Sequence, residues 1–222
     1  IESYDISNWG DGTSVCGMIV FQDGKPYRTG YRRFRMKTVA GTDDYASLAE
    51  TLSRRAGEYA AAKRGEKPDA PSNQFSVLPD LILLDGGRGQ VSAVRAALKG
   101  TLLEHVPLFG MVKDDHHRTR AIVDEAGAEI AINRNRGIFT FVTSIQDEVH
   151  RYANAYRKQM MHKKSYAATL TALPGVGEKT SAALLAHFKT VANVRAASIS
   201  DLEEVPGISH KKAEAIYNGL HG

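Results

Sequence analysis

The sequence predicts an α/β domain with a mixed sheet and flanking helices, followed by a small all-α domain. Apolar, β-branched runs alternate with helical patterns from the first residue onward, and an internal repeat of helical hairpins occupies the C-terminal part. Such alternation is typical of a sheet covered by helices, whereas paired helical hairpins need no sheet. We therefore expect two domains, over residues 1–164 and 165–222.

Three antiparallel strands are expected to open the first domain, over residues 1–7, 13–21 and 31–37. The middle run is apolar and β-branched, and Asp23-Gly24 shortly after it is a strong signal for a hairpin turn. Such a turn returns the chain beside the strand that it has just left. The start of the chain thus predicts an antiparallel part of the sheet.

Helices and strands alternate after this opening. The segment Thr42-Asp43-Asp44 caps a helix that runs to about residue 64, with Tyr45 among its apolar positions. Residues 81–84 form a continuous apolar run, which is typical of a central strand buried on both faces. A second helix and a strand over residues 108–112 follow. Helices are therefore expected on both faces of a mixed sheet.

One long helix is expected after Gly137. Apolar residues recur there at spacings of three and four, the period of a helix with one buried face. The residues that carry this period are Ile138, Phe141, Val142, Ile145, Val149, Tyr152 and Tyr156.

The composition is that of a globular protein with a buried core. The chain is 42% hydrophobic and 24% charged, and no apolar run approaches the ~20 residues of a membrane-spanning helix. Cys16 is the single cysteine, which excludes an intrachain disulfide and a cysteine-based zinc site and fits a reducing compartment. We expect a cytoplasmic protein with no membrane partner. Because the first residue is Ile1, we expect a piece of a longer protein.

Positive charge is concentrated in two short stretches. The chain has 29 Lys and Arg against 25 Asp and Glu, a net charge of +4. Residues 25–37 hold six basic residues and residues 150–164 hold five, with no acidic residue in either stretch. In the first stretch Arg33, Arg35 and Lys37 alternate. This alternation predicts three cations on one strand face, which suits contact with a nucleic-acid backbone.

The internal repeat predicts a tandem of helix-hairpin-helix motifs. Residues 170–177 match residues 202–209 at an offset of 32 residues, and each copy has a Pro-Gly turn between two helical segments. Glycine permits a positive φ and a close approach to a phosphate, which the N–H groups of the next helix then face. Such a pair binds the backbone of a duplex without reading its sequence. A plain helical hairpin with a glycine-rich turn is the alternative.

Glycines and lysines at these turns are the candidate phosphate contacts. They are Gly175, Gly177, Lys179, Gly207, Lys211 and Lys212, and Ser209 stands where the second copy should have its second glycine. Residues 165–222 hold five basic and five acidic residues. Binding there is expected to depend on backbone amides and a few lysines, because no excess charge is available.

Two carboxylates lie in expected strands, where burial of a charged carboxylate costs free energy unless it is paired or holds a metal. Asp5 lies within the first expected strand, and Asp85 ends the buried apolar run. If these strands are neighbours, the pair offers oxygen ligands to Mg²⁺ or Mn²⁺, which hold a phosphate and activate water. Spacing alone leaves the alternative open that Asp85 ends a strand in a turn and Asp5 caps a loop.

Two further polar residues lie beside these expected elements. His150 follows the apolar position Val149 in the long helix, at the edge of the buried face. It either reaches a cleft or is an ordinary surface histidine, which is the commoner case. Lys113 follows a strand end and is equally consistent with a surface lysine and with a group that stabilises a scissile phosphate.

In order along the chain, these residues resemble the C-terminal half of the UvrC family, the dual-incision nucleases of bacterial nucleotide excision repair. The motifs that carry the resemblance are Tyr4-Asp5-Ile6-Ser7, Gly12-Thr13-Ser14, Tyr31-Arg32-Arg33-Phe34, Asp43-Asp44-Tyr45-Ala46, Leu84-Asp85-Gly86-Gly87-Arg88-Gly89-Gln90, Asp147-Glu148-Val149-His150-Arg151 and the tandem hairpins. The resemblance covers nearly the whole chain.

The resemblance implies an RNase H-like endonuclease domain followed by the tandem helix-hairpin-helix module. It implies that Asp5, Asp85 and His150 are the catalytic and metal-binding residues for Mg²⁺ or Mn²⁺, and that Asp44 is a further carboxylate needed for incision. The implied substrate is double-stranded DNA that contains a lesion, cut on the 5′ side. UvrB is the implied protein partner, bound by a segment upstream of this chain.

Two departures from the family pattern and two alternative functions accompany the resemblance. Asn8 stands where the family often has histidine, and the loop over residues 64–77 is longer than usual.

One alternative is a duplex-binding module without catalysis, against which the presence of Asp5, Asp85 and His150 argues. The other is a structure-selective, recombination-type nuclease on the same fold.

Overall fold

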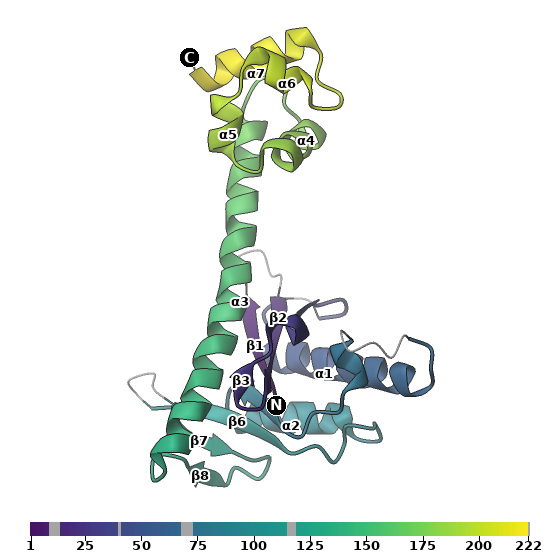
Figure 1. The fold of residues 1–222 in the computed structure, drawn as a ribbon, viewed down its shortest axis with the longest axis vertical. Helices are drawn as coiled ribbons and strands as arrows, with labels where there is room; N and C mark the ends of the chain where they lie inside the picture. The colour runs from purple at the N-terminus through teal and green to yellow at the C-terminus, as the bar shows by residue number, and fades with distance from the viewer. Residues whose placement is uncertain (9–13, 40, 68–72, 115–118, 222) are drawn as a thin grey trace. The chain divides into compact units, whose positions relative to one another are not determined.

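The computed structural model describes residues 1–8, 14–39, 41–67, 73–114 and 119–221 (Figure 1). Gly12 and Thr13 of the resemblance, and part of the loop over residues 64–77, lie outside the described residues. The chain divides into two compact units, Ile1–Arg157 and Lys158–Gly222. The division falls within helix α3 (Arg136–Thr171), so residue 164 is an internal residue of this helix.

The first unit is built on a mixed sheet. Its strands are β1 (Glu2–Asn8), β2 (Ser14–Gln22), β3 (Lys25–Pro26), β4 (Arg32–Arg35), β5 (Ile82–Asp85), β6 (Leu108–Lys113), β7 (Thr119–Val123) and β8 (Glu129–Ala131). The order is β3-β2-β1-β5-β6-β7-β8, and β4 also pairs with β2. Strand β5 is parallel to β1 and β6, and the other pairs are antiparallel. The predicted mixed sheet is confirmed.

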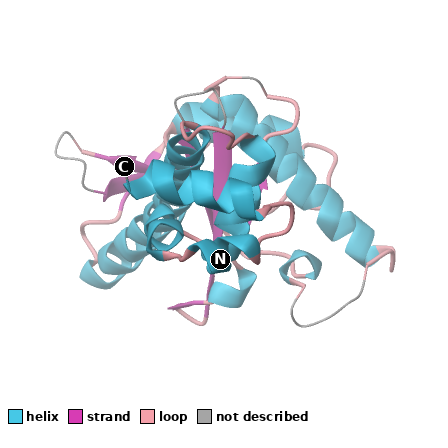
Figure 2. Cartoon of the chain, turned by 90° about the horizontal axis from the view of Figure 1, so that it is seen from above, coloured by secondary structure: helices cyan, strands magenta, loops and turns pink. Residues whose placement is uncertain are grey.

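Helices cover both faces of this sheet (Figures 1 and 2). They are α1 (Asp44–Lys63), α2 (Arg88–Leu98) and the first part of α3, with short 3-10 turns at Arg28–Gly30 and Gln74–Ser76. Tyr4 and Leu84 pack with α1 and α2, whereas Leu83 packs with α3 on the other face. Successive strand residues point to opposite faces. Asp5 and Asp85 therefore belong to the α3 face.

Local sequence signals account for the start of α1 and for the first turn of the sheet. The Asp43 side chain accepts a hydrogen bond of 3.0 Å from the Ala46 N–H, as an N-cap does. Asp23 and Gly24 have φ values of 51° and 74°, which join β2 to β3 in a hairpin. Both features confirm the sequence predictions.

Two features differ from the sequence predictions. Strands β7 and β8 extend the sheet beyond β6, where no strand was predicted. They were missed because β7 contains a charged residue among its apolar residues and β8 is short and exposed. Tyr45 was predicted on the apolar face of α1, but it is 50% exposed. Its ring lies against the helix backbone of α2, since a Cβ atom on Gly89 would come within 2.5 Å of the ring.

The second unit is the small all-α domain that the repeat predicts. After the end of α3 it contains α4 (Glu178–Phe188), α5 (Val191–Ala196), α6 (Ile199–Glu203) and α7 (His210–His221). Val176 of the first turn and Ile208 of the second are buried in one apolar core with Leu184, Leu202 and Ile216. The two turns thus share a core, which fixes them as one unit.

Candidate active site and DNA-binding hairpins

Asp5 and Asp85 lie on neighbouring parallel strands. Tyr4 pairs in register with Leu84 across β1 and β5, and each aspartate is the next residue of its strand. Neighbouring strands are ~4.8 Å apart, and residues at matching positions point to the same face. The strand adjacency on which the sequence prediction depended is therefore present, and both carboxylates belong to the α3 face of the sheet.

Burial and neighbouring negative charge make it costly to ionise the Asp5 carboxylate. Asp5 is 8% exposed. Burial is the largest cause that raises its pKa to about 7, and the negative charges of Asp85 and Asp44 act in the same direction, whereas the Lys113 ammonium opposes them. A divalent cation at this place would offset both the desolvation and the repulsion between the carboxylates.

Asp85 is held by two donors. The Lys113 ammonium lies 3.0 Å from Oδ2 of Asp85, and Nε2 of Gln146 donates to Oδ1 over 2.6 Å. Gln146 is itself buried and fully satisfied, because its Nε2 also donates to the Met111 carbonyl over 3.3 Å and its Oε1 accepts from Thr119. These contacts fix the orientation of the Asp85 carboxylate.

Gln146 was missed in the sequence predictions, although a signal was present. It lies four residues before His150, so the two side chains share one face of α3. Gln146, His150 and Lys113 line a cavity of 620 Å³. The other lining residues are Thr119, Phe139, Thr143 and Asp147.

His150 lies at this cavity. Its side chain is exposed on α3. Among the residues that the structure describes, no three Asp, Glu, His or Cys side chains are grouped closely enough to hold one metal ion. His150 is thus a neighbour of the Asp85 network, through Gln146 and Lys113, and lies apart from the carboxylate pair.

Asp44 approaches the pair from the other face of the sheet. It is the first residue of α1, and its Oδ1 accepts a hydrogen bond of 2.8 Å from Nδ2 of Asn8. Oδ1 of Asn8 accepts in turn from the Ser14 hydroxyl at 2.6 Å. Asn8 therefore anchors Asp44 at the end of β1.

The donor set fits Mg²⁺ or Mn²⁺. Both ions prefer oxygen ligands, and Mg²⁺ is commonly held by one or two carboxylates while it keeps several waters. Asp5 and Asp85 supply two carboxylates side by side, and the raised pKa of Asp5 is the cost that a cation would remove. The pair supplies the two carboxylates with which such an ion is commonly held.

Without metal, Asp5→Asn is expected to stabilise the protein at high pH. The folded-state pKa of Asp5, about 7, lies above its ordinary value of 3.8, so stability is lost as pH rises between these values. Unfolding free energies measured in EDTA should be similar near pH 4 and should differ by up to ~4 kcal/mol at pH 8, with the variant more stable. An equal difference at both pH values would contradict the buried charge.

Gly175 and Gly207 require the conformation that only glycine adopts easily. Their φ values are 77° and 85°, in equivalent positions of the two hairpins. Gly177 has a φ of −84° and caps α4, and nothing lies within 4 Å of a Cβ atom built on it. A positive φ is thus needed at Gly175 but not at Gly177, which explains why Ser209 is accepted at the position of Gly177 in the second copy.

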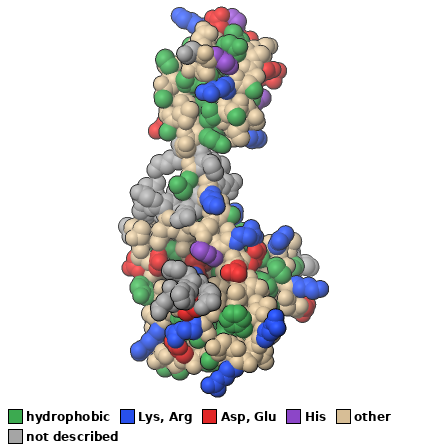
Figure 3. All heavy atoms as spheres, turned by 90° about the vertical axis from the view of Figure 1, so that its left-hand side faces the viewer, with side chains coloured by type: hydrophobic (Ala, Val, Ile, Leu, Met, Phe, Trp, Pro, Cys, Tyr) green, Lys and Arg blue, Asp and Glu red, His purple; other side chains and the backbone are tan. Residues whose placement is uncertain are grey.

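The two hairpins lie side by side. Nζ of Lys212 donates to the hydroxyl of Thr180 over 2.7 Å, and these residues are equivalent in the repeat, 32 positions apart. This contact between equivalent residues brings the start of α4 beside the start of α7. Lys179 and Lys211 are exposed beside them. Basic and acidic side chains are otherwise intermixed on the visible face of this unit (Figure 3).

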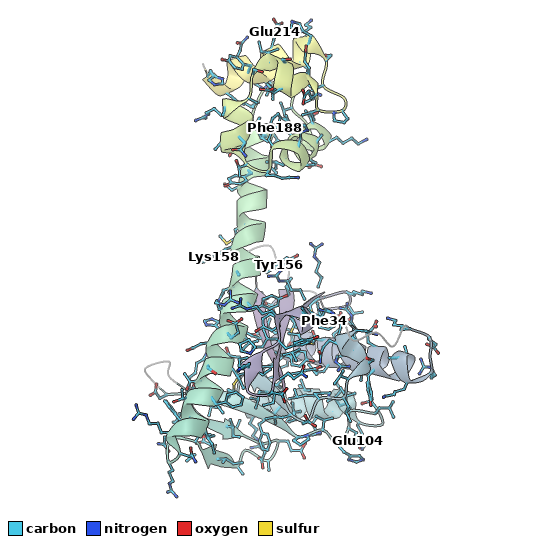
Figure 4. All side chains as sticks on the ribbon, in the orientation of Figure 1. Phe34, Glu104, Tyr156, Lys158, Phe188 and Glu214 are labelled. Atoms are coloured by element: carbon cyan, nitrogen blue, oxygen red, sulfur yellow. The ribbon has the colours of Figure 1, made fainter. Side chains whose placement is uncertain are left out.

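The strand cations are only partly arranged as predicted. Arg33 and Arg35 share one face of β4, where Arg33 stacks on the rings of Tyr152 and Tyr156 at 4.3 and 4.8 Å. Arg35 donates to the Tyr156 hydroxyl at 2.8 and 3.0 Å, and Tyr156 projects from α3 toward the strands (Figure 4). Lys37 lies beyond the end of β4, so the alternation stops at Arg35.

The fold and the carboxylate pair define the class: an RNase H-like nuclease domain joined to a tandem helix-hairpin-helix domain. Residues 1–154 match the family model described as UvrC RNAse H endonuclease domain, and residues 167–221 match the SAM-like helix-hairpin-helix tandem. The chain belongs to the UvrC RNase H endonuclease domain family.

Curated relatives match over the whole chain. It is 41% identical over 230 residues to the UvrABC system protein C of Alkaliphilus oremlandii and 43% identical over 225 residues to that of Clostridium acetobutylicum. Each match covers 100% of this chain and 36% of the relative. The chain thus spans about a third of the length of these relatives. No helix among the described residues is long and apolar enough to cross a membrane.

Proposed function

We propose that the chain is the nuclease and duplex-binding part of a nucleotide excision repair enzyme, which hydrolyses a phosphodiester on the 5′ side of a lesion. The observation that carries this proposal is the adjacency of Asp5 and Asp85 on β1 and β5. Lys113 and Gln146 contact Asp85 alone, so they leave the buried Asp5 carboxylate uncompensated beside it, and a divalent cation would offset that cost. Family membership supports the assignment to repair, and the side of the cut is what the resemblance of the sequence motifs implies.

In the proposed mechanism, Asp5 and Asp85 hold Mg²⁺ or Mn²⁺. A bound ion of this kind stabilises charge on a phosphate and lowers the pKa of a water molecule. Lys113 adds positive charge beside the same phosphate from the end of β6. His150, exposed at the cavity, either accepts a proton from the attacking water or donates a proton to the leaving oxygen. Asp44, anchored by Asn8, adds negative charge near the ion.

Gln146 is a positioning residue in this mechanism, because it contacts Asp85 and not the substrate. Replacing it with methionine removes the amide and keeps the size. We expect incision to fall ~10-fold to 100-fold and half-maximal activity to need more metal, with duplex affinity unchanged. Gln22→Met, on an exposed residue at the end of β2, is the matched control. An unchanged metal requirement would mean that Gln146 contributes only to packing.

Nicking of a lesion-containing duplex by the full-length protein with UvrB tests the proposal. We expect a single cut 5′ to the lesion with Mg²⁺ or Mn²⁺ and none in EDTA. Undiminished cleavage in excess EDTA would contradict the metal mechanism. Binding without any cleavage would indicate the duplex-binding module, and preferential cutting of a branched junction over the lesion duplex would indicate a recombination-type nuclease.

The hairpins are proposed to hold the duplex while the first unit cuts it. Gly175 and Gly207 form the turns, the N–H groups that begin α4 and α7 face the phosphates, and Lys179, Lys211 and Lys212 add charge. The side-by-side arrangement of the two equivalent hairpins suits the two strands of a duplex. UvrB is the proposed protein partner, as the name of the relatives, a protein of the UvrABC system, suggests.

A further inference from the structure

The two basic stretches of the sequence meet in the first unit. One stretch covers residues 25–37 and the other begins at His150 in α3. Arg33 and Arg35 of the first stretch contact Tyr152 and Tyr156 of the second. Residues more than 100 positions apart in the sequence thus meet on one surface of the first unit, which the active-site proposal does not use.

A pocket of 440 Å³ opens within this surface. It is lined by Arg28, Tyr31, Arg33, Arg151, Tyr152 and Ala155, and we call it the arginine pocket. Three of these residues are arginines from three different elements, from the turn before β4, from β4 and from α3. Arginine is the residue best suited to bind phosphate, because its planar group donates two parallel hydrogen bonds.

The charges of the arginine pocket are only partly compensated. Glu148 pairs with Arg151 at 2.6 Å and accepts a hydrogen bond of 3.0 Å from the Tyr31 hydroxyl. These contacts lower the pKa of Glu148, so it is ionised at neutral pH. Arg28 and Arg33 have no carboxylate within ion-pair distance in the part of the chain that the structure describes, which leaves a net positive charge.

Aromatic stacking holds Arg33 in one place. Its guanidinium lies over the rings of Tyr152 and Tyr156, and Tyr152 packs in turn edge-on against Tyr31 at 5.1 Å. Stacking uses the faces of a guanidinium and leaves its N–H edges available to a ligand. A pre-positioned arginine loses less side-chain entropy when it binds an anion.

The arginine pocket is too far from the carboxylates to hold the phosphate that is cut. Arg33 pairs in register with Gly17, and Gly17 with Asp5, so two strand spacings separate Arg33 from Asp5. Two spacings amount to ~10 Å. Helix α3 passes between, since Tyr152 and Ala153 pack over Gly17. A ligand in the pocket is therefore a second phosphate, on the opposite side of α3 from the cavity of His150.

We propose that the arginine pocket binds a backbone phosphate of the DNA duplex, away from the scissile bond. The proposal rests on the proposed function only in that duplex DNA is the ligand, and it requires no catalysis. The chemistry recognised is a phosphate group, which a duplex or a free phosphate compound supplies. Binding here would set the direction in which the duplex leaves the active site.

The test measures duplex affinity of the whole chain in EDTA, where no cutting occurs, at several salt concentrations. Neutralising two cations with Arg28→Gln and Arg33→Gln should lower affinity ~8-fold at 0.1 M salt for each backbone phosphate that the pocket no longer neutralises. The slope of log K against log salt should flatten by ~0.9 for each such phosphate. Lys63→Gln with Lys99→Gln, which removes the same charge from α1 and from the end of α2, is the matched control.

A variant that is expected to raise duplex affinity shows that a change in affinity does not come from misfolding alone. Glu148→Gln keeps an acceptor for Tyr31 but frees Arg151, so duplex affinity should rise and the slope should steepen. A fall in affinity in the double arginine variant no greater than in the lysine control, or no gain with Glu148→Gln, would overturn the proposal. Inorganic phosphate that displaces the duplex from wild type at millimolar concentration, and equally from the arginine variant, would also overturn it.

Discussion

Asp5→Asn and Asp85→Asn are each expected to reduce incision by about three orders of magnitude, a loss of ~4 kcal/mol of transition-state stabilisation. Asparagine keeps the size of the side chain but removes one of the two charges that hold the cation. Duplex affinity in EDTA should stay the same or increase, because carboxylates without a cation repel phosphate. The measurement is nicking of a lesion duplex by the full-length protein with UvrB, together with a binding isotherm.

Asp80→Asn is the matched control for this prediction, since Asp80 is exposed and precedes β5. It should cut at the wild-type rate. Wild-type incision by either active-site variant would contradict the assignment of that carboxylate. A parallel loss of duplex affinity would mean that the carboxylates support the fold of the DNA-binding surface instead of the chemical step.

Gly175→Val combined with Gly207→Val is expected to lower duplex affinity ~100-fold. Both positions have positive φ, which costs a β-branched residue ~1–3 kcal/mol at each site and displaces the N–H groups that follow. Neutral N–H groups release few counterions when they bind phosphate. The affinity should therefore fall with little change in the salt slope, whereas neutralising Arg33, Arg35 and Lys37 should flatten it by up to ~0.9 per phosphate.

Gly177→Ala is a control that changes the N-cap residue of α4 and leaves the positive-φ turn at Gly175 unchanged. Its φ is −84° and the space around it is open, so the variant should fold and bind nearly as the wild type does. If the double valine variant flattened the salt slope as much as the charge variants do, the second unit would act through charge. The proposed division of labour between amides and cations would then be wrong.

The elements with strong local signals could be predicted from the sequence. The Asp43 cap, the Asp23-Gly24 turn and the period of α3 each depend on residues close together in the chain, and the structure has all three. Strand β8 has three exposed residues and no apolar pattern. It forms because β7 offers it an edge, which is a tertiary effect that periodicity does not report.

The same limit applies to the candidate site. Asp5 and Asp85 stand out because a carboxylate in an apolar strand is costly wherever the strand lies. Gln146 is neutral and polar, and apart from its spacing of four residues from His150 it resembles any exposed glutamine on a helix. Its role became visible only when α3 packed on β6 and brought the amide to Asp85. Arg28 and Arg151 likewise become a pair of phosphate candidates only through the packing of α3 beside β4.

The central claim is that Asp5 and Asp85 hold one divalent cation between them. Anomalous diffraction from crystals of the chain soaked in Mn²⁺ measures this directly. The account predicts an anomalous peak that both carboxylates reach at ligand distances of ~2.0–2.6 Å, and its loss in Asp85→Asn. Carboxylates more than ~8 Å apart, or a peak that neither carboxylate touches, would contradict it.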